Sequence, residues 1–258
     1  MNLGLVNSVW IGSPLDTAEG IHKTREIGFD SIDVAADPLE IDIVERARIR
    51  NACREAGLPV DAVCCAALGI ADFNRTVRRF HIDRCMEHLD LVYELEGRIL
   101  SLGIGEYVWQ QQVIPPREQW KWAVEGVREL GEYAAALGLC VAIEMEPWPM
   151  SIIHVIEEMN EFLCEVDCPA VRASLDLSRL ATAEIAKFAG RIAQVRLECG
   201  EGDAMLLAEI QRTGFDGALS VRLRPGTAAG EVAGQVAEAY RRAGRLMREA
   251  GVARPASA

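Results

Sequence analysis

Four charged residues follow short apolar runs in the second half of the chain. They are Glu146, Asp176, Arg196 and Arg222. A carboxylate beside a carbonyl compound can act as a general base, and a guanidinium can bind a carboxylate or phosphate through two hydrogen bonds or stabilise a developing oxyanion. If these four positions meet in one pocket, the chemistry they favour is proton abstraction next to a carbonyl group.

The elements that must position these residues alternate between strand and helix along the chain. We predict strands at residues 3–6, 29–34, 60–66, 98–102, 140–146, 171–175, 192–197 and 217–221. We predict helices at residues 17–27, 41–56, 72–95, 115–137, 151–166, 180–189, 204–213 and 227–250. Short strands that are mostly apolar are expected when both faces of a sheet are buried. These units predict an α/β fold, a single (β/α)8 TIM barrel over residues 1–250 with a frayed tail at 251–258.

The alternative to a barrel is a doubly wound open sheet. No Gly-rich phosphate-binding loop follows the first predicted strand, which disfavours a dinucleotide-binding fold of that kind. In a TIM barrel the carboxyl ends of all strands meet at one face, and active sites lie there. The barrel prediction therefore brings the four charged residues together.

Composition limits the class of protein. The chain has 258 residues, of which 50% are hydrophobic, enough for one large core. Its formal net charge of −12 disfavours nucleic acid or an anionic membrane as a partner. No apolar run approaches the roughly 18 residues of a membrane span, and the N-terminus lacks the basic start of a signal peptide. We therefore expect a cytoplasmic protein that acts on a small molecule and keeps its cysteines reduced.

Four segments of the second half connect the chain to a known family. They are Ile143-Glu144-Met145-Glu146-Pro147, Ser174-Leu175-Asp176-Leu177-Ser178-Arg179, Gln194-Val195-Arg196-Leu197 and Gly214-Phe215-Asp216-Gly217-Ala218-Leu219-Ser220-Val221-Arg222. With them the chain resembles the xylose isomerase-like TIM barrels, a superfamily of sugar isomerases and epimerases that also holds the apurinic endonucleases. The resemblance covers most of the chain. It implies an isomerase, an epimerase or a lyase of carbohydrate metabolism, and it leaves a homo-oligomer open.

The chain departs from this family at the metal site. Enzymes of the family bind a divalent cation with Glu, Asp, His and Glu on strands five to eight. Glu146 and Asp176 match the first two ligands, but Arg196 stands in place of the His and Arg222 in place of the final Glu. Arg179 stands where a further His usually follows the Asp by three residues. Arginine stays protonated and cannot act as a ligand, so a degenerate site without metal or other cofactor is expected.

The charge of these five residues bears on the substrate. Glu146 and Asp176 bring −2 and the three arginines bring +3, which leaves +1 and favours a small anionic carbonyl or sugar-like compound. Glu146 is the expected base, and Arg196 and Arg222 are expected to bind the substrate anion or oxyanion. Asp176 and Arg179 are expected to bind and orient beside them. A carboxylate next to arginines has its pKa lowered and is a weaker base, an effect that a bound anion would relieve.

Other interpretations of the same residues remain open. The arginines can neutralise the acids in buried salt bridges, in which case the barrel binds a ligand or a protein partner without catalysis. A one-residue error in strand register would point some arginines into the helices instead. A metal-dependent enzyme with rewired ligands would need Glu198, Cys199 or His154 to turn inward.

Aromatic residues follow three of the predicted strands. They are Trp10, Trp109 and Trp148. Rings at the rim of a barrel can wall a pocket for a sugar-like face. We therefore predict that these tryptophans help to bind the substrate, whose identity the sequence leaves open together with the direction of the reaction.

Overall fold

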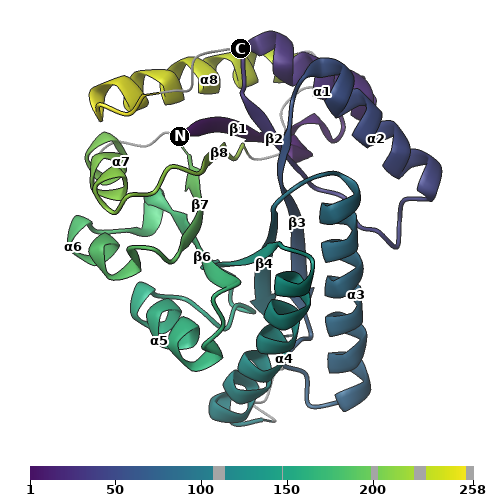
Figure 1. Cartoon of the computed structure of the whole chain (residues 1–258), viewed down its shortest axis with the longest axis vertical. Coiled ribbons are helices and arrows are strands. Elements are labelled where there is room, and N and C mark those ends of the chain that lie inside the picture. The colour runs from purple at the N-terminus through teal and green to yellow at the C-terminus, as the bar shows by residue number, and fades with distance from the viewer. Residues whose placement is uncertain (107–113, 147, 199–202, 224–230, 254–258) are drawn as a thin grey trace.

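Eight parallel strands close into a barrel in the order of the chain (Figure 1). The computed structural model describes residues 1–106, 114–146, 148–198, 203–223 and 231–253. The strands are β1 (Asn2–Val6), β2 (Ser31–Val34), β3 (Val60–Leu68), β4 (Ile99–Gly105), β5 (Cys140–Glu144), β6 (Val171–Asp176), β7 (Ile192–Leu197) and β8 (Ala218–Val221). The predicted TIM barrel is thereby confirmed.

Helices form the outer ring around this barrel (Figure 1). They are α1 (Thr17–Ile27), α2 (Ile43–Ala56), α3 (Arg75–Glu94), α4 (Pro116–Ala136), α5 (Ile156–Val166), α6 (Thr182–Ile185), α7 (Asp203–Arg212) and α8 (Val232–Glu249). Short 3-10 turns are η1 (Asn7–Trp10), η2 (Leu177–Arg179) and η3 (Ala186–Phe188). In the described part of the chain, no helix is both long and apolar enough to cross a membrane.

Local signals explain where the first helices begin and end. Asp16 accepts a hydrogen bond from the backbone of Glu19, which closes a capping box at the start of α1. Gly28 ends α1 with a φ of 116°, a left-handed conformation that glycine adopts without strain. Asp42 caps α2 in the same way as Asp16 caps α1, so α2 begins at Ile43, two residues later than predicted.

The second half departs from the predicted boundaries in four places. Helix α8 begins at Val232 instead of residue 227, and residues 227–230 of the predicted helix lie outside the described residues. Strand β5 ends at Glu144, two residues before the predicted end, so Glu146 lies just beyond the strand. Helix α5 begins at Ile156 instead of residue 151, because Ser151 forms a bridge with Gly105. The helix predicted at 180–189 is reduced to the short α6 followed by η3.

The first residues of the predicted tail, 251–253, contact the rest of the protein. Val252 is buried, and its backbone N–H donates to the carbonyl of Met247 over 2.8 Å. The N-terminal amine of Met1 donates to the carbonyl of Ala253 over 3.4 Å. This first part of the tail therefore packs against the body of the protein, and residues 254–258 lie outside the described residues.

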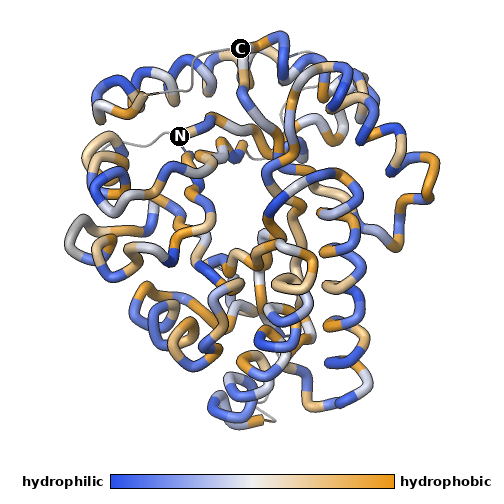
Figure 2. Tube along the Cα trace, viewed as in Figure 1, coloured by the Kyte–Doolittle hydropathy of each residue, from blue (hydrophilic) through white to orange (hydrophobic). Residues whose placement is uncertain are grey.

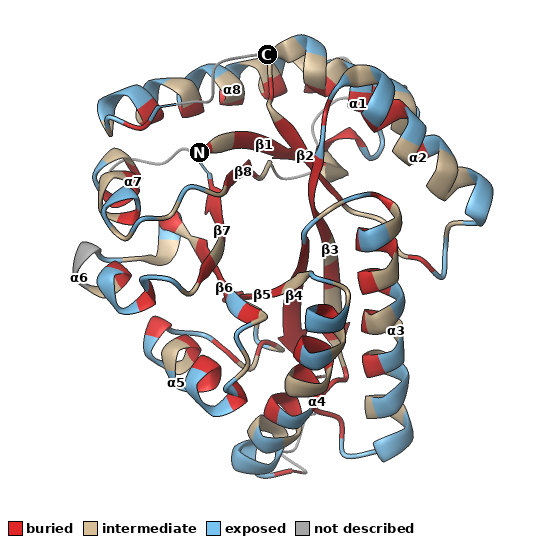
Figure 3. Cartoon of the chain, viewed as in Figure 1, coloured by how far each residue is buried: buried red, intermediate tan, exposed pale blue. Residues whose placement is uncertain are grey.

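The apolar core lies between the strands and the helices. The strands are buried almost throughout, whereas the helices bury one face and expose the other (Figure 3). Hydropathy alternates along the helices in the same sense (Figure 2). The inside of the barrel is different, because it carries a layer of buried polar side chains where TIM barrels usually hold bulky apolar ones. That layer leads directly to the candidate site.

Candidate active site

Strand β5 places Glu144 inside the barrel, where it binds Arg196 of β7. The Nη1 atom of Arg196 donates to Oε2 of Glu144 over 2.7 Å, and Nη2 donates to Oε1, so the pair is bidentate. Glu144 and Arg196 are 6% and 4% exposed. Two buried charges are stable together only when each has good hydrogen-bond partners. Arg196 is therefore fixed chiefly by Glu144, a residue that we did not predict as part of the site.

The second ion pair lies at the carboxyl ends of the strands, beyond the first pair. Glu146 follows the end of β5, and its Oε1 accepts a 2.8 Å hydrogen bond from Nη1 of Arg222, which follows β8. The same Oε1 lies 3.6 Å from Nη1 of Arg196. The Arg222 side chain is 34% exposed, against 5% for that of Arg196. Of the two guanidiniums, Arg222 is thus the one that faces solvent.

The two carboxylates differ in their affinity for protons. Burial raises the pKa of Glu144 to about 7, although the charge of Arg196 acts in the opposite direction. Burial also acts to raise the pKa of Glu146, but hydrogen bonds to Glu144 and Arg222 and the charges of both arginines lower it overall. At neutral pH Glu146 is therefore ionised and of reduced basicity.

Below these pairs, a chain of hydrogen bonds crosses the barrel. The hydroxyl of Ser101 lies 2.7 Å from Oε1 of Glu144 and 2.8 Å from Oε1 of Gln194. The amide of Gln194 donates to Oδ2 of Asp33 over 2.7 Å and to the hydroxyl of Ser220 over 2.9 Å. Asp33 is fully buried, and burial raises its pKa to about 7. The network fixes the floor of the site on side chains from five strands.

Asp176 and Arg179 form a local pair beside the site. Oδ1 of Asp176 accepts from the backbone N–H and the hydroxyl of Ser178, over 2.9 and 2.7 Å. Oδ2 lies 3.9 Å from Nε of Arg179. These contacts stabilise η2, so Asp176 is used to shape the turn after β6. Among the described residues, its only ion-pair partner is Arg179.

The predicted tryptophans have different outcomes. Trp10 is buried, and its indole N–H donates to the hydroxyl of Thr24 in α1 over 3.0 Å. Trp148 is half-buried and lies over Gly103 of β4, because a Cβ atom added there would be 3.5 Å from its ring. Trp109 lies outside the described residues. Trp10 is thus anchored to the fold, and Trp148 is placed at the end of β4.

Trp10 also borders a pocket of about 530 Å³ at the ends of β1, β2 and β3. Cys64 lines this pocket as well, and its Sγ atom is 4.0 Å from Nη2 of Arg196. Cys64 thus separates this pocket from Arg196, and none of the four ion-pair residues lines it. Its charged lining residues are Asp16, Asp37, Glu40, Glu45, Arg48 and Arg84. Acids outnumber arginines there, so the pocket attracts no anion.

These findings change the predicted charge of the site. With Glu144 included, the site holds three carboxyl groups and three arginines, so the sum is zero instead of +1 when all of them are ionised. The argument for an anionic substrate depended on a surplus of positive charge. Glu144 pairs with Arg196 inside the barrel and reduces that surplus. The positive charge that faces solvent is therefore chiefly that of Arg222.

The residues present do not fit a divalent cation. Arg196 and Arg222 both lie within 4 Å of Glu146, and a cation bound there would face two guanidiniums. Glu198 and His154 are exposed, and Cys199 lies outside the described residues. Within the described ranges, no group of three His, Cys, Asp or Glu side chains is arranged to hold a metal. The chemistry of the donor set thus disagrees with the metal centre that the family resemblance implies.

A signal for the missed residues is present in the sequence. Side chains two apart on a strand share a face, so an inward Glu146 implies an inward Glu144. The same spacing recurs in Ser174 and Asp176, Gln194 and Arg196, and Ser220 and Arg222. The sequence prediction uses only the last residue of each pair and therefore misses the lower layer.

Comparisons with known proteins agree with the fold. A model of the xylose isomerase-like TIM barrel family matches residues 21–250. The D-psicose 3-epimerase of Ruminiclostridium cellulolyticum is 24% identical over 166 residues, which are 60% of this chain and 55% of that enzyme, so the match spans about half of the relative's length.

Two solved structures have the same architecture along nearly all of their length. The D-allulose 3-epimerase from Methylomonas sp. has a TM-score of 0.81 at 17% identity, and the alignment covers 95% of this chain and 97% of that enzyme's chain. The 3-keto-D-glucoside 4-epimerase YcjR from E. coli has a TM-score of 0.79 at 18% identity, and the alignment covers 96% of this chain and 99% of that enzyme's chain. At these identities the likeness shows the fold alone. Because the family model spans most of the sequence, the chain belongs to the xylose isomerase-like TIM barrel family.

Proposed function

We propose that the protein is an isomerase or epimerase that abstracts a proton next to the carbonyl group of a small sugar-like compound. The observation that carries this proposal is the position of Glu146. Its carboxylate lies just beyond the carboxyl end of β5, hydrogen-bonded to the partly exposed Arg222 and 3.6 Å from the buried Arg196. The named relatives support the substrate class, since they are epimerases of sugars.

Each residue of the two ion pairs has a role in this proposal. Glu146 removes a proton from the carbon beside the carbonyl, and the electron pair moves onto the carbonyl oxygen. Arg222 donates hydrogen bonds to that oxygen as its charge develops. Delivery of a proton from solvent to the opposite face of the same carbon gives the epimer, and Glu146 then releases its proton to solvent. Return of the abstracted proton to the former carbonyl carbon gives the isomer, when the hydroxyl proton of the enediolate passes to the former carbonyl oxygen. A lyase would start with the same abstraction and then expel a neighbouring hydroxyl.

The low basicity of Glu146 is relieved by the substrate. Arg222 binds Glu146 in the free protein, and a substrate oxygen that takes over one of its N–H groups weakens that bond. The negative charge on Glu146 is then less stabilised, which raises its pKa toward that of an effective base. Glu144 keeps Arg196 in place meanwhile, so fixed positive charge remains beside the reacting atoms. We propose that this charge acts where the resemblance implies a metal.

Hydrogen exchange with solvent tests this proposal without knowledge of the product. The protein is incubated in D2O with a chelator and D-allulose, D-fructose, D-tagatose or L-ribulose, and deuterium incorporation is followed by NMR. We expect incorporation beside the carbonyl of at least one sugar, and its loss in Glu146→Gln. Glu198→Gln is the matched control, because Glu198 is an exposed carboxylate at the end of β7. Exchange that survives in Glu146→Gln would assign the base elsewhere.

A specific observation favours a second candidate function, a barrel that binds a sugar without catalysis. Both oxygens of Glu144 are bound to Arg196, and Glu146 is bound to Arg222, so the acids are paired already. In that case a sugar would raise the melting temperature of the protein, and no deuterium would be incorporated by the wild type. Exchange that depends on Glu146 excludes this candidate.

A further inference from the structure

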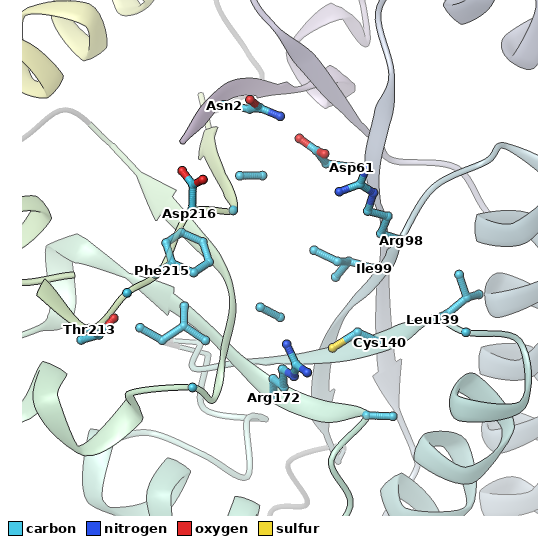
Figure 4. A pocket seen from close by; sticks show the side chains of 18 residues that line it. Asn2, Asp61, Arg98, Ile99, Leu139, Cys140, Arg172, Thr213, Phe215 and Asp216 are labelled. Carbon is cyan, nitrogen blue, oxygen red and sulfur yellow. The ribbon is translucent and has the colours of Figure 1, made fainter. Parts of the chain in front are cut away.

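A second hollow opens on the opposite face of the barrel, at the amino ends of the strands. Its volume is about 550 Å³, and its walls come from the starts of several strands and the loops before them. Figure 4 shows side chains from β3, β5 and β6 around an open centre. Because it lies at the far end of the barrel from Glu146, this hollow is separate from the site described above.

Small side chains at the bottom of the barrel explain why the space is open. TIM barrels normally fill this layer with bulky branched residues. Here Ala62, Ala142 and Ala193 surround Ile99 in a cluster of their own. Ala193, Ile99 and the nearby Ala218 line the hollow directly. The absence of larger side chains at these positions leaves room for a small molecule.

A buried acid points into this space. Asp61, near the start of β3, is only 8% exposed and lines the hollow (Figure 4). Among the described residues, its Oδ2 atom has no hydrogen-bond partner. Burial raises the pKa of this carboxyl, with the nearby Ser31 hydroxyl and then the charge of Arg98 acting against the rise. A buried carboxylate oxygen without a donor is unfavourable, so a ligand hydroxyl there would satisfy it.

Two arginines flank the acid. Arg98 lies beside Asp61, and Arg172 reaches in from the start of β6 (Figure 4). Arg172 is anchored, because its Nε donates to the carbonyl of Pro169 over 3.2 Å. Asp216, the other acid of the lining, is already bound to the N-terminal amine of Met1 over 2.7 Å. The charges left to a ligand are thus two guanidiniums and one carboxylate.

We propose that this hollow is a second binding site, for a small anion that carries hydroxyl groups. The guanidinium of Arg172 binds the anionic group, for which its planar donors are suited. At the other end of the ligand, Asp61 accepts a hydrogen bond from a hydroxyl, and Arg98 lies beside it (Figure 4). A carboxylate and a phosphate ester share this chemistry, and the probes below separate them. The site does not depend on the function proposed for the barrel mouth.

Ligand-observed NMR titration of the full chain tests the site. The probes are glycerate, glycerol 3-phosphate, propionate as an anion without hydroxyls, and glycerol as a neutral control. We expect saturable binding of glycerate, glycerol 3-phosphate or both, and weaker binding of propionate and glycerol. Arg172→Ala should weaken the binding by about 10-fold or more, the usual effect of losing charge-assisted hydrogen bonds. The control variants Arg75→Ala, at the exposed start of α3, and Arg222→Ala, at the barrel mouth, should bind as the wild type does.

A second variant isolates the role of the acid. Asp61→Leu removes the acceptor but keeps the branched shape of the side chain. The ratio of the affinity for glycerate to that for propionate should therefore fall toward one. Three outcomes would overturn the proposal. They are no saturable binding of any anionic probe to the wild type, unchanged binding in Arg172→Ala, and binding that Arg222→Ala weakens instead.

Discussion

The two arginines of the candidate site should differ sharply in what they contribute to stability. Arg196 is 4% exposed and is the bidentate partner of the buried Glu144. Arg196→Met keeps most of the side-chain volume but leaves Glu144 buried without its counter-ion. Removal of one partner of a buried pair costs about 3–5 kcal/mol. For a domain of this size, that corresponds to a fall in Tm of roughly 6–20 °C.

Arg222→Met is the matched comparison. The Arg222 side chain is 34% exposed and donates one hydrogen bond to Glu146. When Arg222 is removed, Glu146 still has the guanidinium of Arg196 nearby. A partly solvated ion pair contributes about 1 kcal/mol or less, so we expect a fall in Tm of only about 2–4 °C. Thermal unfolding followed by circular dichroism, with urea unfolding as a second measure, gives both values.

A double variant checks the reason for the difference. In Glu144→Gln with Arg196→Met, both buried charges are gone, so the combined loss should be clearly smaller than the sum of the two single losses. Equal losses for Arg196→Met and Arg222→Met, or strict additivity in the double variant, would refute the division into a structural and a substrate-facing arginine.

Three further predictions concern protons and the polar floor. Burial raises the pKa of Asp33 in the folded protein from 3.8 to about 7. Between these pH values the folded protein keeps a proton that the unfolded chain has lost, so the free energy of unfolding that this group contributes falls as pH rises. Asp33→Asn should therefore become more stable relative to wild type between pH 5 and pH 8, as measured by urea unfolding. Gln194→Leu removes the partner of Asp33 and of Ser101, and a cost of about 1–3 kcal/mol for each stranded group is expected in the same assay. Since the arginines help to lower the pKa of Glu146, Arg222→Met should move the acidic limb of the pH–exchange profile to higher pH, and an unmoved limb would argue against Glu146 as the base.

The fold was predictable because its signals are local. Capping residues such as Asp16 and stop signals such as Gly28 mark the helix ends, and the apolar runs mark the strands. The prediction failed where tertiary contacts decide. Ser151 pairs with Gly105 instead of opening a helix, and Val252 packs into the core although it follows the last helix.

The candidate site was predictable in outline, but one of its charged residues, Glu144, was missed. Strand ends and the departures from the family identified Glu146, Arg196 and Arg222, which the structure brings together. The pairing of Arg196 with Glu144 was missed, because only side-chain geometry shows which carboxylate takes both of its terminal nitrogens. The position of Trp10 was not predictable from sequence spacing, because it depends on the hydrogen bond that its indole N–H donates to the hydroxyl of Thr24.

Metal content tests most directly whether the arginines stand in place of a cation. The purified protein is analysed for metals before and after incubation with manganese, zinc and magnesium. The guanidiniums of Arg196 and Arg222 beside Glu146 predict a metal content well below stoichiometric in every sample. A stoichiometric metal that is lost in Glu146→Gln would contradict the account and would point to metal-dependent sugar chemistry at the same strand ends.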